Sequence, residues 1–244
     1  MKDVNQALAA AQRPVTAPPG RKRRAFILGN TGKLGEELLN VLLESPLYES
    51  VCVGVRKAMR SHVPRLEPLA VPADMGGWNP AAGMQRAPDD LYLCIEPAAK
   101  SFWRLAKPYV AITSGQATGI ACRMRASGAR RIAIVTPLEA ILQMGSAPTI
   151  HNPDEMEIVK AGFERLLVLR PTDDRQRNAE EGVMESVGGM VTGALASYMR
   201  PKGLQPVRVR RAAQLAVETL ATMADGVQVV GAARLRELVG DPLG

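Results

Sequence analysis

The chain has 244 residues, of which 46% are hydrophobic and 23% charged, a balance typical of a folded globular protein rather than a disordered one. No apolar run reaches the length of a membrane helix, and residues 1–20 lack the apolar centre of a secretory signal, so we expect a cytoplasmic protein without membrane contact. The three cysteines are far apart in sequence, which argues against a zinc knuckle, favours buried thiols and predicts no metal site.

The net charge of +7 is concentrated in two basic runs, residues 21–24 and residues 200–211. Basic runs attract polyanions, but these two lack the interleaved aromatic residues that stack on single-stranded bases. Nucleic-acid binding is therefore disfavoured, and a smaller polyanion remains as the expected ligand.

The predicted strands and helices begin only after an N-terminal segment rich in proline. Prolines interrupt residues 1–23, which we interpret as a flexible basic arm, and folding is expected to begin near Arg24 in a single domain over residues 24–244. Short apolar runs with β-branched residues predict buried strands at residues 25–28, 51–55, 69–71, 91–95, 132–135 and 166–169. Helical spacing predicts helices at residues 33–43 and 116–126, and only a short or irregular helix within residues 76–88. This alternation predicts an α/β fold, a doubly wound parallel sheet, with a small C-terminal region for a substrate or partner from about residue 172.

A glycine-rich turn connects the first predicted strand to the first predicted helix, with the spacing G-x-x-G-x-x-G. Gly29 suits a tight turn, Gly32 lets backbone N–H groups approach a pyrophosphate, and Gly35 lets the helix pack closely on the strand. The helix N-terminus adds partial positive charge, so the turn predicts a dinucleotide site. The site residues predicted from this turn are Gly29, Asn30, Thr31, Gly32, Lys33, Leu34 and Gly35.

The residue that ends the second predicted strand distinguishes NAD from NADP, because an acidic side chain binds the ribose 2′-hydroxyl whereas a basic one accommodates the 2′-phosphate. Arg56 stands there, followed by Lys57, so NADP(H) is the predicted cofactor, although both cations would equally suit a solvated strand end. Asp74, after the third strand, either contacts the adenine amine or caps a helix. We also assign Ile95 and Glu96, at the end of the fourth strand, to the cofactor site.

Together these features resemble the short-chain dehydrogenase/reductase superfamily, in particular the atypical branch that includes the Tat-interacting oxidoreductase-like proteins and the NmrA-like regulators. The likeness spans about residues 24–240 and rests on five segments: the glycine turn, residues 48–57, residues 121–136, the Leu-Arg-Pro of residues 169–171 and residues 206–213. The resemblance implies an NAD(P)-binding Rossmann fold.

The sequence departs from that family at its catalytic positions. The resemblance implies a Tyr as proton donor and a Lys four residues later, and these positions fall near Ala147 and His151, while the serine position falls on Thr136 or Pro137. None of the four tyrosines, at positions 48, 92, 109 and 198, lies in that region. Thr136 and His151 remain as candidates for moving protons, although His151 also suits the start of a helix before residues 152–155.

Three functions are left open. The first is an NADP(H)-binding protein that lacks ordinary reductase activity and serves as a sensor or scaffold. The second is an NADPH-dependent oxidoreductase that acts on a small molecule with a non-standard proton donor. The third is an interaction protein whose basic residues 200–211 dock an acidic protein partner.

Overall fold

The computed structural model describes residues 22–95, 108–136, 150, 152–171 and 209–239. Its strands are β1 (Arg23–Leu28), β2 (Tyr48–Val55), β3 (Leu66–Ala70), β4 (Asp90–Cys94), β5 (Arg131–Val135), β6 (Arg165–Arg170) and β7 (Gly226–Gly231). Its helices are α2 (Lys33–Glu44), α3 (Ser114–Ala126), α4 (Pro153–Lys160), α7 (Val209–Thr222) and α8 (Ala232–Val239), with a 3-10 turn η1 (Pro80–Gly83).

The strands form one parallel sheet in the order β3-β2-β1-β4-β5-β6-β7. This order reverses direction between β1 and β4, which is the switch point where ligands of doubly wound sheets bind. The predicted α/β fold with a doubly wound parallel sheet is therefore confirmed. The residues after the predicted boundary at about 172 continue this sheet, because β7 pairs with β6 along its whole length.

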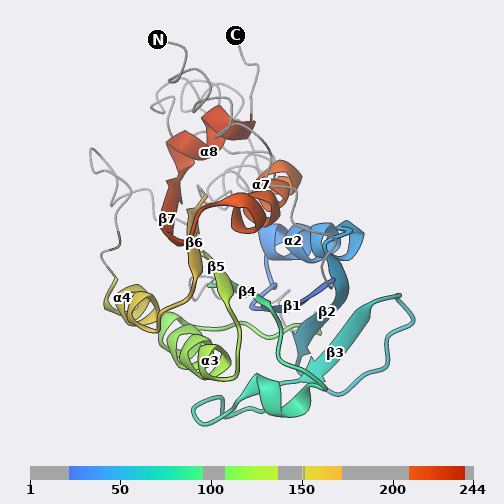
Figure 1. The fold of residues 1–244 in the computed structure, drawn as a ribbon. Helices are drawn as coiled ribbons and strands as arrows, with labels where there is room; N and C mark the ends of the chain where they lie inside the picture. Colours follow the sequence, from blue (N-terminus) through green and yellow to red (C-terminus); the bar gives the residue numbers. More distant parts are fainter. Residues whose placement is uncertain (1–21, 96–107, 137–149, 151, 172–208, 240–244) are drawn as a thin grey trace, which may run out of the picture.

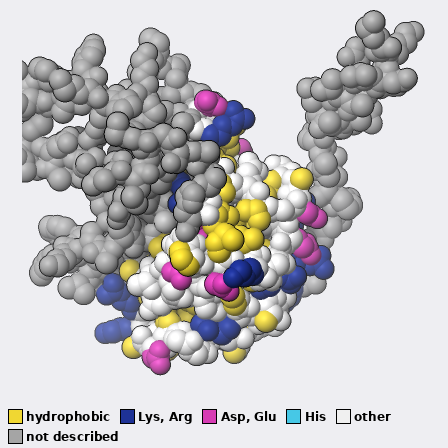
Figure 2. Space-filling view, turned by 90° about the vertical axis from the view of Figure 1, so that its left-hand side faces the viewer, with side chains coloured by type: hydrophobic (Ala, Val, Ile, Leu, Met, Phe, Trp, Pro, Cys, Tyr) yellow, Lys and Arg dark blue, Asp and Glu magenta, His cyan; other side chains and the backbone are white. Residues whose placement is uncertain are grey.

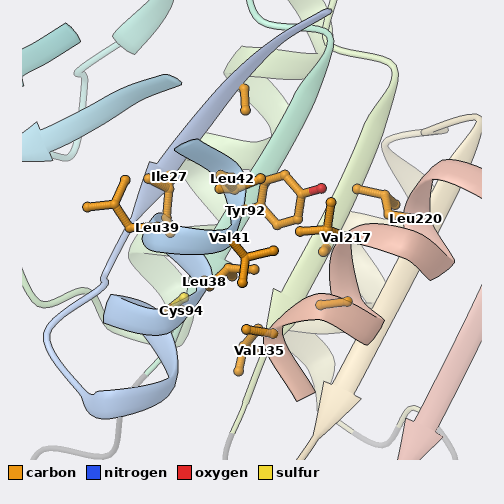
Figure 3. Packing of buried hydrophobic residues seen from close by; sticks show 14 of the residues in the cluster. Ile27, Leu38, Leu39, Val41, Leu42, Tyr92, Cys94, Val135, Val217 and Leu220 are labelled. Atoms are coloured by element: carbon orange, nitrogen blue, oxygen red, sulfur yellow. The ribbon is translucent and has the colours of Figure 1, made fainter. Parts of the chain in front are cut away.

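Helices cover both faces of the sheet, with α2 and α7 on one side and α3 and α4 on the other (Figure 1). Successive residues of β1 therefore enter different cores: Ala25 and Ile27 pack toward α2 and α7, and Phe26 and Leu28 pack toward α3. Figure 3 shows the first of these cores, where side chains of α2 and α7 cover one face of the sheet. Leu39 of α2 lies beside Ile27, and Val217 of α7 lies nearer to Tyr92. Burial on both faces explains why the central strands are continuous apolar runs.

Several boundaries differ from the sequence predictions. β3 is not buried: it begins at Leu66 and its side chains are exposed or half-buried, because it is the edge of the sheet. β1 begins at Arg23, two residues before the predicted strand of residues 25–28. α3 begins at Ser114 rather than residue 116, since Thr113 and Gln116 form a capping box that fixes its start.

Three arginines of the two basic runs, Arg23, Arg24 and Arg210, make internal contacts. The Arg24 guanidinium donates to Ser50 and Glu67, and Arg23 lies 3.6 Å from the buried Asp90 carboxylate. In the second run, Arg210 pairs with carboxylates of α2. On the face in Figure 2, basic side chains are interspersed with acidic ones rather than forming a continuous positive surface.

The thiols are only partly as expected. Cys52 and Cys94 are buried, but Cys122 is exposed because it lies on the outer face of α3, so the prediction of buried thiols is wrong at this position. Within the described ranges, no helix has the length and apolarity to span a bilayer. The same ranges contain no cluster of three residues suited to hold a metal ion.

Candidate functional site

The glycine turn lies where β1 ends and α2 begins. Gly29 has a φ of +83°, and a Cβ built there would overlap the carbonyl oxygen of Cys94 in the neighbouring β4. A Cβ at Gly35 would lie 2.6 Å from the Cα of Asn30. Both positions therefore exclude any larger residue. The turn thus packs tightly against β4 and leads into the N-terminus of α2, whose N-cap is Gly32.

Asn30 is the unusual residue of this turn. Its side chain is fully buried, yet neither amide atom has a hydrogen-bond partner within the described residues. Its neighbour Thr31 is also buried, and its backbone N–H donates to the Gly29 carbonyl at 2.8 Å. Buried polar groups without partners are rare in folded proteins and are costly. An unsatisfied amide beside a helix N-terminus fits a site for a polar ligand such as a nucleotide.

Residues 108–112, here called the crossing segment, pass over this turn. Tyr109 forms an isolated bridge with Val55 at the end of β2, and Ile112 forms another with Ile95 just after β4. Because β1 lies between β2 and β4, the segment must cross the carboxyl end of β1. The Ile112 Cγ1 atom would indeed lie 3.0 Å from a Cβ at Gly29. The place above β1 where doubly wound sheets bind ligands, here called the crevice, is therefore crossed by backbone.

Arg56 lies at the end of β2 beside this segment. Its side chain is exposed, its Nε donates to the Tyr109 carbonyl at 2.9 Å, and its backbone N–H donates to the Pro108 carbonyl at 2.8 Å. Lys57 is exposed next to it. The Arg56 guanidinium thus lies beside the crossing segment at the mouth of the crevice. Burial, and then the charge of Glu36, raise the pKa of the adjacent Tyr109.

The remaining predicted cofactor residues are spread along the same edge. Asp74 is exposed and accepts a hydrogen bond from the Gly76 N–H at 2.9 Å, so it closes a turn and does not cap a helix. Ile95 is buried under the crossing segment through its bridge to Ile112. Glu96 lies outside the described residues.

A cavity of about 400 Å³ opens beside α2, on the sheet face opposite α3. Of the predicted cofactor residues, only Lys33 contributes to it, and Tyr109 stands between the cavity and the crevice. Its lining residues are Lys33, Glu36, Glu37, Leu39, Asn40, Tyr109 and Val209. With two carboxylates and one lysine, the lining does not suit a dianionic nucleotide phosphate.

Thr136 follows β5, at the same carboxyl edge of the sheet. Its hydroxyl donates to the Glu155 carboxylate at 3.5 Å, and this carboxylate accepts a 2.7 Å hydrogen bond from the Arg170 guanidinium. The Glu155 side chain is only 2% exposed, so α4 is tied to the end of β6 by a buried ion pair. Of the other predicted catalytic positions, Ala147, His151 and Pro137 lie outside the described residues.

Two of the tyrosines are distant from this edge. The Tyr48 hydroxyl donates to Asp90 at 2.7 Å and lies 2.8 Å from the Tyr92 hydroxyl, near the amino ends of β2 and β4. Burial raises the pKa of both tyrosines well above the ordinary value. Neither hydroxyl can therefore reach a ligand at the carboxyl edge. Tyr198 lies outside the described residues.

Sequence reasoning missed the crossing segment and the Glu155–Arg170 pair. The first had a readable signal, because Tyr-Val-Ala-Ile is a β-prone run between Pro108 and the capping residue Thr113. The second had none, since an acidic residue in the first turn of a helix normally only complements the helix dipole.

Comparison with known proteins gives matches in structure only. No family model matches the sequence, and no curated protein matches it. A short-chain dehydrogenase/reductase family oxidoreductase from Burkholderia thailandensis is similar with a TM-score of 0.54 and 17% identity, over 88% of this chain and 94% of that one. MoeE5, solved with UDP-glucuronic acid and NAD, has a TM-score of 0.53 and 12% identity over 85% and 75% of the two chains. WbmG from Bordetella bronchiseptica, solved with NAD, has a TM-score of 0.52 and 14% identity over 93% and 81%.

At such low identity the likeness establishes the architecture alone. The chain has the doubly wound, Rossmann-like α/β fold that it shares with these similar structures.

Proposed function

We propose that this chain binds NADP(H) in the crevice above the glycine turn and serves in the cytoplasm as a cofactor-binding sensor or scaffold. The observation that carries this proposal is the turn itself: glycines at positions 29 and 35 that admit no Cβ, beside the buried Asn30 amide, which has no hydrogen-bond partner among the described residues. A glycine turn of this kind at a helix N-terminus suits a pyrophosphate. The solved structures of MoeE5 and WbmG, which contain NAD, support a dinucleotide as the ligand.

The preference for NADP(H) over NAD(H) rests on Arg56. Its exposed guanidinium lies at the end of β2, where the fold places the selector of the 2′-substituent. A phosphate accepts two parallel hydrogen bonds from a guanidinium, and no carboxylate stands at this strand end to bind a 2′-hydroxyl. The residues of this strand end therefore favour the phosphorylated cofactor.

The role without ordinary reductase activity rests on the sequence positions near Ala147 and His151, which lack the tyrosine and lysine of active relatives. A second function is favoured by one contact. Thr136 stands at the carboxyl edge with its hydroxyl directed to the Glu155 carboxylate, an arrangement that would serve an NADPH-dependent oxidoreductase with a non-standard proton donor. Under either function, the partner or small-molecule substrate would approach the carboxyl edge of the sheet.

Calorimetric titration of the full chain with NADP⁺ and NAD⁺ tests the proposal. We expect NADP⁺ to bind more tightly, and Arg56→Gln to reduce the ratio of the two affinities about 10- to 100-fold, the range expected when a charge-assisted hydrogen bond is lost. Arg60→Gln, which removes another exposed arginine of the same loop, should leave the ratio unchanged. No binding of either nucleotide at millimolar concentration, or an equal effect of both substitutions, would contradict the proposal.

A further inference from the structure

The crossing segment lies in the part of the crevice that the proposed nucleotide requires. Its Ile112 side chain lies over Gly29, and its Tyr109 carbonyl oxygen accepts the hydrogen bond from Arg56 Nε. These are the backbone face and the cation on which the proposed binding depends. The segment and a nucleotide therefore compete for the same groups of the protein.

Few backbone hydrogen bonds attach this segment to the sheet. Backbone pairing with the sheet consists of isolated bridges, Val55 with Tyr109 and Ile95 with Ile112, whereas β1 beneath it pairs along its length with β2 and β4. Segments held by few hydrogen bonds at the rim of a sheet open at much lower free energy than its central strands. Ile112 anchors one end of the segment, because it is buried in the core on the α3 side of the sheet. Opening of the segment must therefore withdraw this one side chain while the sheet stays folded.

We propose that residues 108–112 form a displaceable gate over the nucleotide crevice, with the Arg56 guanidinium as its latch. This inference rests on the proposed function, because the gate has a purpose only if the crevice binds a nucleotide. The Tyr109 carbonyl is a neutral acceptor of one hydrogen bond, whereas a 2′-phosphate is charged and accepts two. A 2′-phosphorylated nucleotide therefore replaces the Tyr109 carbonyl as the hydrogen-bond acceptor of the Arg56 guanidinium, and the gate stays open.

The gate gives the crevice two states. Only molecules with an open gate bind a nucleotide. The apparent affinity therefore equals the affinity of the open state multiplied by the fraction of molecules in which the gate is open. Opening costs the same for NAD⁺ and NADP⁺, so the ratio of their affinities still reports only the direct contact with the 2′-phosphate. The position of the segment reports occupancy of the crevice, which is what a sensor must pass to a partner.

A reversible cross-link tests the gate in the full chain. The bridge partners Val55→Cys and Tyr109→Cys are introduced together with Cys122→Ser, which removes the exposed native thiol. Intact mass confirms the disulfide, and NADP⁺ binding is measured by calorimetry before and after reduction of the same sample. We expect the oxidised protein to bind at least about 30-fold more weakly than the reduced one. Equal binding in both forms, or failure of the disulfide to form, would overturn the gate.

Hydrogen exchange of the unmodified chain gives a second test that needs no substitution. The probe is 2′,5′-ADP, which carries the 2′-phosphate, with 5′-AMP as the control. We expect saturating 2′,5′-ADP to slow exchange in residues 29–35. It should speed exchange in residues 108–112 and at the backbone amide of Arg56, which donates to the Pro108 carbonyl in the ligand-free protein. Protection of both regions would overturn the gate while leaving nucleotide binding intact. Absence of binding by the unmodified and the reduced protein would instead contradict the proposed function.

Discussion

Asn30 carries an energetic cost in the ligand-free protein, because its buried amide has no hydrogen-bond partner among the described residues. A buried amide without partners typically costs about 1–3 kcal/mol, and this one lies in the described turn at full burial. Asn79, the N-cap of η1, offers a contrast, because its side chain accepts from the Ala81 N–H and donates to Ser127. The two asparagines should therefore respond in opposite ways to truncation.

We expect Asn30→Ala to leave the thermal midpoint of the ligand-free protein unchanged or raised, and to weaken NADP⁺ binding about tenfold, the effect of one lost hydrogen bond. Asn79→Ala should lower the midpoint through loss of about 1 kcal/mol of capping energy and leave binding unchanged. Differential scanning calorimetry and titration calorimetry measure the two effects. An equal fall in midpoint for both variants would show that the Asn30 amide is satisfied in solution.

The buried tyrosines make stability depend on alkaline pH. Burial raises the pKa of Tyr48 and Tyr92 in the folded protein, so their neutral forms stabilise the fold below the unfolded pKa of 10.0, and this contribution is lost as pH rises above it. Burial also raises the pKa of Cys52 from 9.0 to about 12. The loss of folding stability therefore begins already above pH 9.0.

Urea unfolding between pH 8 and 11 should accordingly show a free energy of unfolding that falls above pH about 9–10, by about 1.4 kcal/mol per pH unit for each group that ionises only in the unfolded chain. Tyr48→Phe should reduce this slope. A free energy that stays constant to pH 11 would be inconsistent with burial of these groups.

At the scale of elements, α4 is held to the sheet by a buried ion pair. Glu155→Ala leaves the Arg170 guanidinium buried without that partner, which typically costs about 3–5 kcal/mol. On the same helix, Glu157 pairs with Lys160 where both side chains are more than half exposed, at 56% and 65%. Glu157→Ala should therefore cost less than about 1 kcal/mol. Urea denaturation measures both values, and similar losses would show that Glu155 is not an anchor.

The local signals of the sequence explain which elements could be predicted. The buried strands were recognisable because each is a continuous apolar run, and Asn152-Pro153 does open α4 as its helix-start signal indicated. β7 was not predicted: its first residues are exposed, and its only partner, β6, lies far away along the chain. The crossing segment was missed for a similar reason, because its two bridges join residues from different strands rather than neighbours in sequence.

The position of the glycine turn could be predicted from the local sequence, but the residues that cover it could not. Its position between β1 and α2 follows from the sequence, since a positive φ at Gly29 and a close approach at Gly35 demand glycine. What lies above the turn does not follow, because it depends on how residues far along the chain return over the end of β1. The pairing of Glu155 with Arg170 does not follow from the sequence either, because an acidic residue in the first turn of a helix normally complements only the helix dipole.

At the scale of the whole molecule, the sheet brings together the glycine turn after β1, a basic residue on β2 and a hydroxyl on β5 along one carboxyl edge. This is the edge at which doubly wound sheets bind their ligands. The crossing segment lies over the end of β1 at this edge. A dinucleotide bound as proposed and this segment must therefore exclude one another.

A crystal structure of the full chain grown with saturating NADP⁺ tests this requirement most directly. It should show the pyrophosphate against the backbone of residues 29–35, the 2′-phosphate within hydrogen-bond distance of the Arg56 guanidinium, and residues 108–112 displaced from the end of β1. A bound nucleotide whose 2′-phosphate lies away from Arg56, or a turn that stays covered by Ile112 with no nucleotide beside it, would contradict the account.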